Sequence, residues 1–136
     1  MLAVGFLEEI IFRGLLFQAM CKDHVKMAVI VSSITFGMGH IVNLINGSGA
    51  DLLSNVLQVG YAIAAGFLFT VIFFKTKSLL ACIGTHSVLN ALSVFGNETA
   101  MTAGKEIISA AALAGISILY TIYILKLDGN MKNIVL

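Results

Sequence analysis

Residues 5–14 read GFLEEIIFRG, and they place three ionisable side chains in a segment that is otherwise apolar enough to lie in lipid. A charged side chain at the centre of a bilayer costs ~3 kcal/mol on insertion scales. Arg13 follows Glu9 by four residues, so a helix brings the two together in the favourable order, with the carboxylate first. Glu8 lies roughly 100° further round the helix and has no such local partner. A carboxylate in this setting marks a candidate functional site.

The composition predicts a membrane protein. Of the 136 residues, 59% are hydrophobic and 11% are charged, whereas soluble domains carry about 25% charged residues. The formal net charge of +1 argues against a nucleic-acid partner, which needs a clustered basic surface. The two cysteines, Cys21 and Cys82, form neither a disulfide framework nor a CxxC metal motif.

We predict an all-α fold, a polytopic transmembrane bundle with about five membrane helices in a single domain over residues 1–136. The predicted helices span residues 2–21, 25–45, 51–74, 78–95 and 105–125, and Ser78 is placed to cap the fourth. Polar turns separate them at 22–24, 46–49, 75–77 and 96–99, and a short polar tail lies around 128–130. The chain has no proline, so we expect no proline kink.

The lysines predict the orientation of the chain in the membrane. They gather in the first turn, the third turn and the tail, as Lys22, Lys26, Lys75, Lys77, Lys126 and Lys132. By the positive-inside rule, these segments are cytoplasmic and the first helix descends from the outside. The lipid bilayer, in our expectation a prokaryotic plasma membrane, is therefore a partner of the chain.

Two further polar patterns lie on the second and fourth predicted helices. Phe36 precedes His40 by one turn, and His86 and Asn90 are spaced by four residues, so the latter two share a face. Counted from the cytoplasmic lysines, Glu8 and His40 lie 14 residues inside their helices. His86 and Asn90 lie nine and 13 residues inside theirs. At 1.5 Å per residue, these depths are roughly 13–21 Å, which predicts one shared site near the bilayer centre.

Small residues on the second helix favour close packing at this depth. Ser33, Gly37 and Gly39 are side chains small enough to allow two helix backbones to approach each other. We expect all three to take part in that approach.

The combination EExxxR, FxxxH and HxxxN, in this order within membrane helices, resembles the CPBP family of CAAX prenyl proteases and bacteriocin-processing enzymes, also called the ABI family. Glu8, Glu9 and Arg13 match the first motif, and the pairs described above match the second and third. The resemblance covers a core of about residues 5–92. Family members usually have several helices before the first motif. We therefore expect a fragment or core of a longer chain, or a minimal member.

The resemblance implies a membrane-embedded endopeptidase in which a glutamate and a histidine activate water. Carried over, it assigns the general base to Glu8 and the water-binding histidine to His40. His86 and Asn90 would donate hydrogen bonds to the oxyanion of the tetrahedral intermediate. The other two residues of the first motif, Glu9 and Arg13, would position Glu8 and balance its charge.

A zinc-dependent form of the same protease is an alternative. Glu8, His40 and His86 are residue types that bind catalytic zinc. The usual HExxH helix is absent, and the resemblance favours a metal-free glutamate mechanism, so we expect no cofactor.

Two other classes of function stay open at this point. A non-catalytic membrane interaction protein, such as a bacteriocin self-immunity factor, would use the same helices as a binding scaffold. A transporter would use the buried glutamate and histidines as a proton relay. For the protease, a prenylated CAAX tail, a bacteriocin leader or another membrane-proximal peptide is compatible as the peptide or protein substrate.

Overall fold

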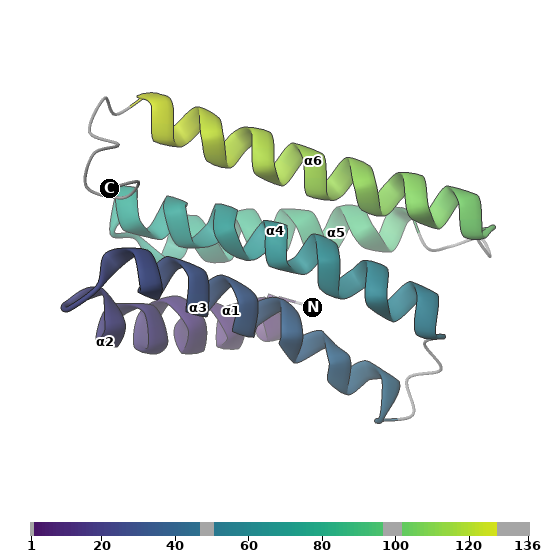
Figure 1. Ribbon diagram of the computed structural model, residues 1–136, viewed down its shortest axis with the longest axis horizontal. Coiled ribbons are helices and arrows are strands. Elements are labelled where there is room, and N and C mark those ends of the chain that lie inside the picture. Colours follow the sequence, from purple (N-terminus) through teal and green to yellow (C-terminus); the bar gives the residue numbers. More distant parts are fainter. Residues whose placement is uncertain (1, 47–50, 97–101, 128–136) are drawn as a thin grey trace.

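The computed structural model describes residues 2–46, 51–96 and 102–127, and the regular structure in these segments is helical (Figure 1). The first helix has three parts, α1 (Leu2–Glu9), the π-helical η1 (Ile10–Phe17) and α2 (Gln18–Cys21). The others are α3 (Val25–Met38), continued by the 3₁₀-helix η2 (Gly39–Leu44), then α4 (Leu52–Thr76), α5 (Leu79–Gly96) and α6 (Ala103–Leu127). The predicted all-α fold with five helices is confirmed. The turns predicted at 47–49 and 97–99 and the tail at 128–130 lie outside the described residues.

Three stretches in the described part of the chain are long and apolar enough to cross a membrane. They are Val25–Leu44, Leu52–Thr76 and Ala103–Leu127. The first helix is about as long but carries the charged residues of the GFLEEIIFRG segment. Its outward face is nevertheless apolar, because Leu7, Ile11 and Leu15 are all at least half exposed. Such side chains suit contact with lipid, as expected for a membrane protein.

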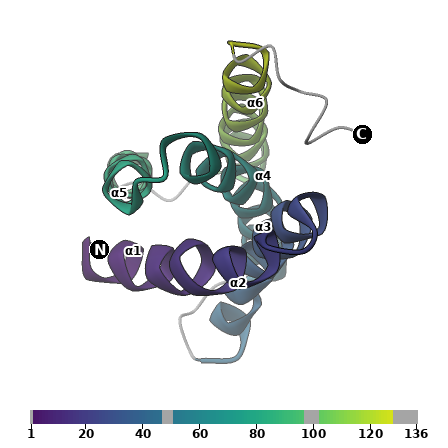
Figure 2. The ribbon, with the colours of Figure 1, turned by 90° about the vertical axis from the view of Figure 1, so that its left-hand side faces the viewer.

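α4 is the central helix of the bundle. It packs against α3, α5 and α6, and also contacts η1 and η2. The first helix crosses the bundle, so that α1 contacts α5 while α2 contacts α3 (Figure 2). α6 lies along α4 and starts at the same end of the molecule (Figure 1). This arrangement brings α1, the α3–η2 junction, α4 and α5 to one buried region.

α3 and α4 approach each other through small residues. A Cβ atom on Gly37 would lie 2.3 Å from the Cγ1 atom of Ile63, and one on Gly66 would lie 2.9 Å from the Ser33 carbonyl oxygen. The prediction that Ser33 and Gly37 allow close packing is confirmed. For Gly39 it is wrong, since nothing lies within 4 Å of a Cβ built there. Gly39 begins η2, which still contacts α4, but Gly39 itself is exposed.

The ends of α4 and α5 are defined by local hydrogen bonds. Asp51 caps α4 by accepting from the Ser54 backbone N–H at 3.0 Å, and this bond lowers the pKa of the Asp51 carboxyl below its ordinary value. Lys77 ends α4 in the left-handed conformation, with φ of 55°. The predicted cap of the next helix is confirmed, because the Ser78 hydroxyl accepts from the Ala81 N–H at 3.3 Å.

Candidate active site

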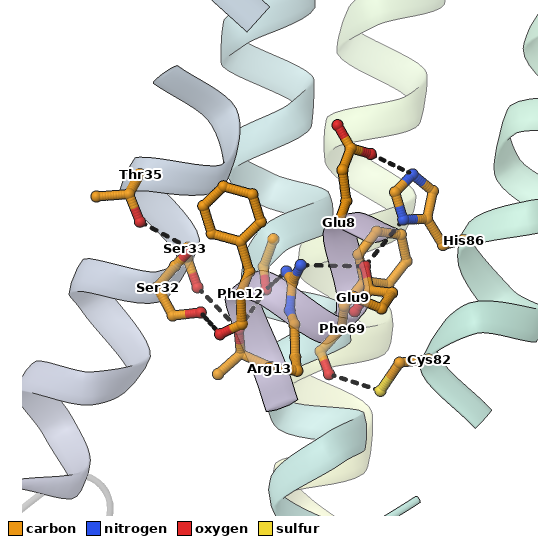
Figure 3. A network of polar contacts seen from close by, with 12 residues as sticks. Glu8, Glu9, Phe12, Arg13, Ser32, Ser33, Thr35, Phe69, Cys82 and His86 are labelled. Atoms are coloured by element: carbon orange, nitrogen blue, oxygen red, sulfur yellow. Dashed lines mark hydrogen bonds and ion pairs between the residues drawn. The ribbon is translucent and has the colours of Figure 1, made fainter. Parts of the chain in front are cut away.

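The centre of the candidate site is a buried carboxylate with two partners. Glu9 Oε1 accepts a hydrogen bond from Arg13 Nη1 at 3.0 Å and lies 2.8 Å from His86 Nδ1 (Figure 3). Glu9 and Arg13 are both 0% exposed. The predicted pairing of these two residues across one helical turn is therefore confirmed. Since a carboxylate only accepts, we assign the proton in the second contact to Nδ1.

Arg13 also joins the first helix to α4. Its Nη2 donates to the Gly66 carbonyl oxygen at 2.9 Å, and that carbonyl also accepts from the Thr70 hydroxyl at 2.8 Å. The guanidinium lies 4.5 Å from the centre of the Phe36 ring and 5.2 Å from that of Phe69. A cation on aromatic faces is stabilised by the ring quadrupole, most strongly where water is excluded.

Glu8 finds its partner on α5. Its Oε2 lies 3.5 Å from His86 Nε2, and its side chain is 26% exposed, whereas that of His86 is 5% exposed. Arg13, Glu9, His86 and Glu8 thus form a continuous chain of contacts, which begins buried in the bundle and ends at a partly accessible carboxylate (Figure 3). We call these four residues the polar chain.

Aromatic rings fix the orientation of His86. The Phe69 ring stacks on the imidazole with centroids 4.9 Å apart and planes 18° apart. Phe36 meets the imidazole edge-on at 5.5 Å. Gly5 leaves room on a further side, where a Cβ atom would lie 3.5 Å from the imidazole.

His40 lies at the start of η2, one turn after Phe36. The two rings meet edge-on at 5.8 Å, so Phe36 contacts both histidines of the site. The backbone carbonyl of His40 accepts from Asn55 Nδ2 at 2.8 Å, and Asn55 is 1% exposed. Asn55 thereby fixes the backbone that carries His40.

A cavity of about 360 Å³ opens beside the polar chain. It is lined by residues from α1, α3, η2, α4, α5 and α6. The polar side chains that line it are His40, Gln58, Tyr61, His86, Asn90 and Ser117. The structure therefore brings three predicted site residues, His40, His86 and Asn90, to one cavity, with Glu8 against His86 and with Glu9 and Arg13 buried behind it.

Three buried polar atoms of this region have no hydrogen-bond partner among the described residues: Glu9 Oε2, Arg13 Nε and Ser87 Oγ. Ser87 follows His86 in sequence, but no base bonds to its hydroxyl in the part of the chain that the structure describes. The buried Cys82 thiol donates to the Phe69 carbonyl oxygen at 3.4 Å. Neither residue therefore forms the nucleophile–base pair of a serine or cysteine hydrolase.

The zinc ligand set considered from the sequence is not clustered in the structure. Among the described residues, no group of three or more His, Cys, Asp or Glu side chains could hold a metal ion. Glu8, His40 and His86 are all described residues, so this statement includes them.

The fold and the site define a polytopic helical membrane protein whose bundle encloses two carboxylates, an arginine and two histidines. A family model described as "Type II CAAX prenyl endopeptidase Rce1-like" matches residues 1–92. The chain belongs to this family of membrane proteases, which is the CPBP family indicated by its three motifs. No curated protein and no solved structure matches the chain.

Proposed function

We propose that this protein is an intramembrane endopeptidase that hydrolyses a peptide bond near the membrane, with Glu8 and His40 activating the attacking water. The observation that carries this proposal is the polar chain. It ends in a carboxylate that is 26% exposed and lies against His86, which lines the cavity together with His40 and Asn90. A general base must be accessible to water while its orientation is fixed from behind, and Glu8 meets both requirements.

In the proposed reaction, Glu8 takes a proton from water while the water oxygen attacks the carbonyl carbon of the peptide. The carbonyl oxygen becomes an oxyanion, which accepts hydrogen bonds from Asn90 and His86. Glu8 then passes its proton to the amide nitrogen, and the C–N bond breaks to give a carboxylic acid and an amine. Each oxyanion donor in a site of this kind is typically worth about 3–4 kcal/mol.

His86 has two tasks in this proposal. We take His86 as the imidazolium, because a neutral imidazole carries only one N–H. Its Nδ1–H donates to Glu9 throughout, and its Nε2–H faces Glu8 in the resting site. Protonation of Glu8 removes the negative charge that attracts this second N–H, which is then available to the oxyanion. Glu9 and Arg13 hold the imidazole in place from the protein side. Protonation of Glu8 and hydrogen bonding of the oxyanion are thus linked through the same N–H of His86.

The test is cleavage of a quenched fluorescent peptide library by the purified full chain, as wild type and as Glu8→Gln. Loss of a positioned general base lowers the rate by about 10²–10⁴-fold. Because glutamine keeps the shape of the side chain, helix content should be unchanged. Glu106→Gln, the same change at the start of α6, is the matched control and should retain activity.

Three results would redirect the proposal. Cleavage by Glu8→Gln at the wild-type rate would rule out Glu8 as the base. Loss of wild-type activity on addition of a strong chelator would instead favour the zinc-dependent form. An inert wild type that still binds a protein partner would favour the non-catalytic immunity or interaction function.

A further inference from the structure

One wall of the cavity lies outside the family match. Leu113 and Ser117 of α6 line the cavity, whereas the match ends at residue 92. The residues of the three motifs all lie before this boundary. α6 therefore adds to the site a surface that the family motifs do not specify.

The packing of α6 fixes the position of this wall. Ala110 and Ser117 are 8% and 3% exposed, and α6 packs mainly against α4. Leu113 lies between them at spacings of three and four residues, so the three side chains share one face. Leu113 is half-buried, with its neighbours on that face anchored in the bundle.

Apart from His40 and His86, the side chains that line the cavity are uncharged. Val4, Ala62, Ala65 and Leu89 contribute apolar surface from α1, α4 and α5, and no Asp, Glu, Lys or Arg lines the cavity within the described residues. Its volume of about 360 Å³ falls within the range of sites that bind small molecules. Burial of a lysine side chain there would be unfavourable, because no carboxylate lines the compartment within the described residues.

We propose that this compartment binds one large uncharged side chain of the peptide substrate beside the scissile bond, and that Leu113 sets the size it accepts. Ser117, one turn further along α6, forms part of the same cavity wall. This inference rests on the proposed function, since the compartment borders His86 and Asn90. A lipid acyl chain has similar chemistry and is the competing occupant.

The experiment changes the size of the wall and of the substrate together. One cleaved library peptide is remade with alanine, leucine, phenylalanine or lysine at each residue flanking the cleaved bond. kcat/KM is then measured for the wild type, Leu113→Ala and Leu113→Phe. Removal or addition of a few methylene groups in an apolar pocket changes the ratio of kcat/KM between a large and a small substrate by roughly 10–200-fold.

At one flanking position, we expect Leu113→Ala to raise the phenylalanine-to-alanine preference by about tenfold and Leu113→Phe to lower it. Lysine should be rejected by all three proteins. The matched control is Ile116→Ala with Ile116→Phe, because Ile116 is 52% exposed and does not line the cavity. Its variants should keep the wild-type preference.

Binding provides a readout that does not require turnover. The same peptides, fluorescently labelled, are titrated against Glu8→Gln with and without the Leu113 substitutions. Opposite shifts in size preference for Leu113→Ala and Leu113→Phe support the inference. An equal effect on all peptides, as expected for a structural role or a bound lipid, overturns it even where the wild type cleaves. An inert wild type contradicts the proposed function. A library peptide selected by binding then carries the same replacements, one position at a time, and its binding preferences decide the inference separately.

Discussion

Arg13 allows a carboxylate to lie fully buried in the first helix. It pairs with Glu9 on its own helix, donates to the Gly66 carbonyl on α4, and faces the rings of Phe36 and Phe69. A buried ion pair is expensive to desolvate, and the cost is offset only where further hydrogen bonds complete the geometry. Arg13 makes those bonds with two different nitrogens, which a lysine ammonium with its single nitrogen does not reproduce.

We therefore expect Arg13→Met to lower the free energy of unfolding by about 3–5 kcal/mol, because the buried Glu9 carboxylate would lose its guanidinium partner and keep only the contact with His86. Arg13→Lys should have an intermediate effect. The measurement is loss of helical circular dichroism on titration with a denaturing detergent.

Two variants control this prediction. Lys22→Met removes a positive charge from an exposed residue of the first turn and should change little. Adding Glu9→Gln to Arg13→Met removes the carboxylate charge and should restore part of the stability. An Arg13→Met protein as stable as Lys22→Met would contradict a stabilising role for the buried pair.

At the scale of the element, the first helix is widened where it carries the site. Gly5, Glu9, Arg13 and Phe17 are all buried, at intervals of four residues. In an α-helix of 3.6 residues per turn such a stripe drifts round the axis. The π-helical η1 has a wider turn, formed by i→i+5 hydrogen bonds, and this compensates for the drift. Glu9, Arg13 and Phe17 consequently face the bundle together.

The close contact between α3 and α4 should depend on Gly37 and not on Gly39. In Gly37→Ala the new Cβ atom would lie 2.3 Å from Ile63 Cγ1 and 2.7 Å from the Ile63 backbone nitrogen, so the helices must separate. Gly39→Ala meets nothing within 4 Å and gains helix propensity, worth up to about 1 kcal/mol.

We expect Gly37→Ala to be destabilised by about 1–3 kcal/mol, as for overpacking in a core. Gly39→Ala should be neutral or slightly stabilised. Detergent-induced unfolding of both variants checks the difference, and equal stability of the two would show that the close contact is unimportant.

Local spacing accounts for the parts of the site that the sequence predicted. The Glu9–Arg13 pair, the shared face of His86 and Asn90 and the close packing at Gly37 all follow from helical periodicity. The contact of Glu8 with His86 joins residues 78 apart in sequence, and periodicity within one helix carries no information about it. Asn55 is a polar residue in an otherwise apolar helix, but its bond to the His40 carbonyl depends on how η2 meets α4.

The whole molecule is asymmetric in charge along its long axis. Lys22 lies in the turn before α3, Lys75 in the last turn of α4, and Lys77 directly after α4. Figure 1 shows these helix ends at the end of the molecule where α6 finishes, and Lys126 is in the last turn of α6. The opposite end holds Asp51, Glu106 and one lysine of α6, Lys105. There the Ser54 hydroxyl contacts Asp51 at 2.7 Å and both carboxylate oxygens of Glu106 at 3.1–3.2 Å. The folded protein thus keeps the separation of charge predicted from its turns.

This asymmetry predicts that the lysine-bearing end faces the cytoplasm. Two exposed positions report the two ends, Lys22 in the first turn and Thr102 before α6. Each is replaced by cysteine in a Cys21→Ser background, where the remaining Cys82 is 0% exposed and should not react. A membrane-impermeant maleimide added to intact cells should label Thr102→Cys at once, and Lys22→Cys only after permeabilisation.

The background protein alone should stay unlabelled. The reverse pattern, or labelling of both positions in intact cells, would contradict the predicted orientation. With the predicted pattern, Glu8 lies 14 residues inward of a cytoplasmic turn, so in the proposed reaction the peptide bond would have to enter the bundle to reach Glu8.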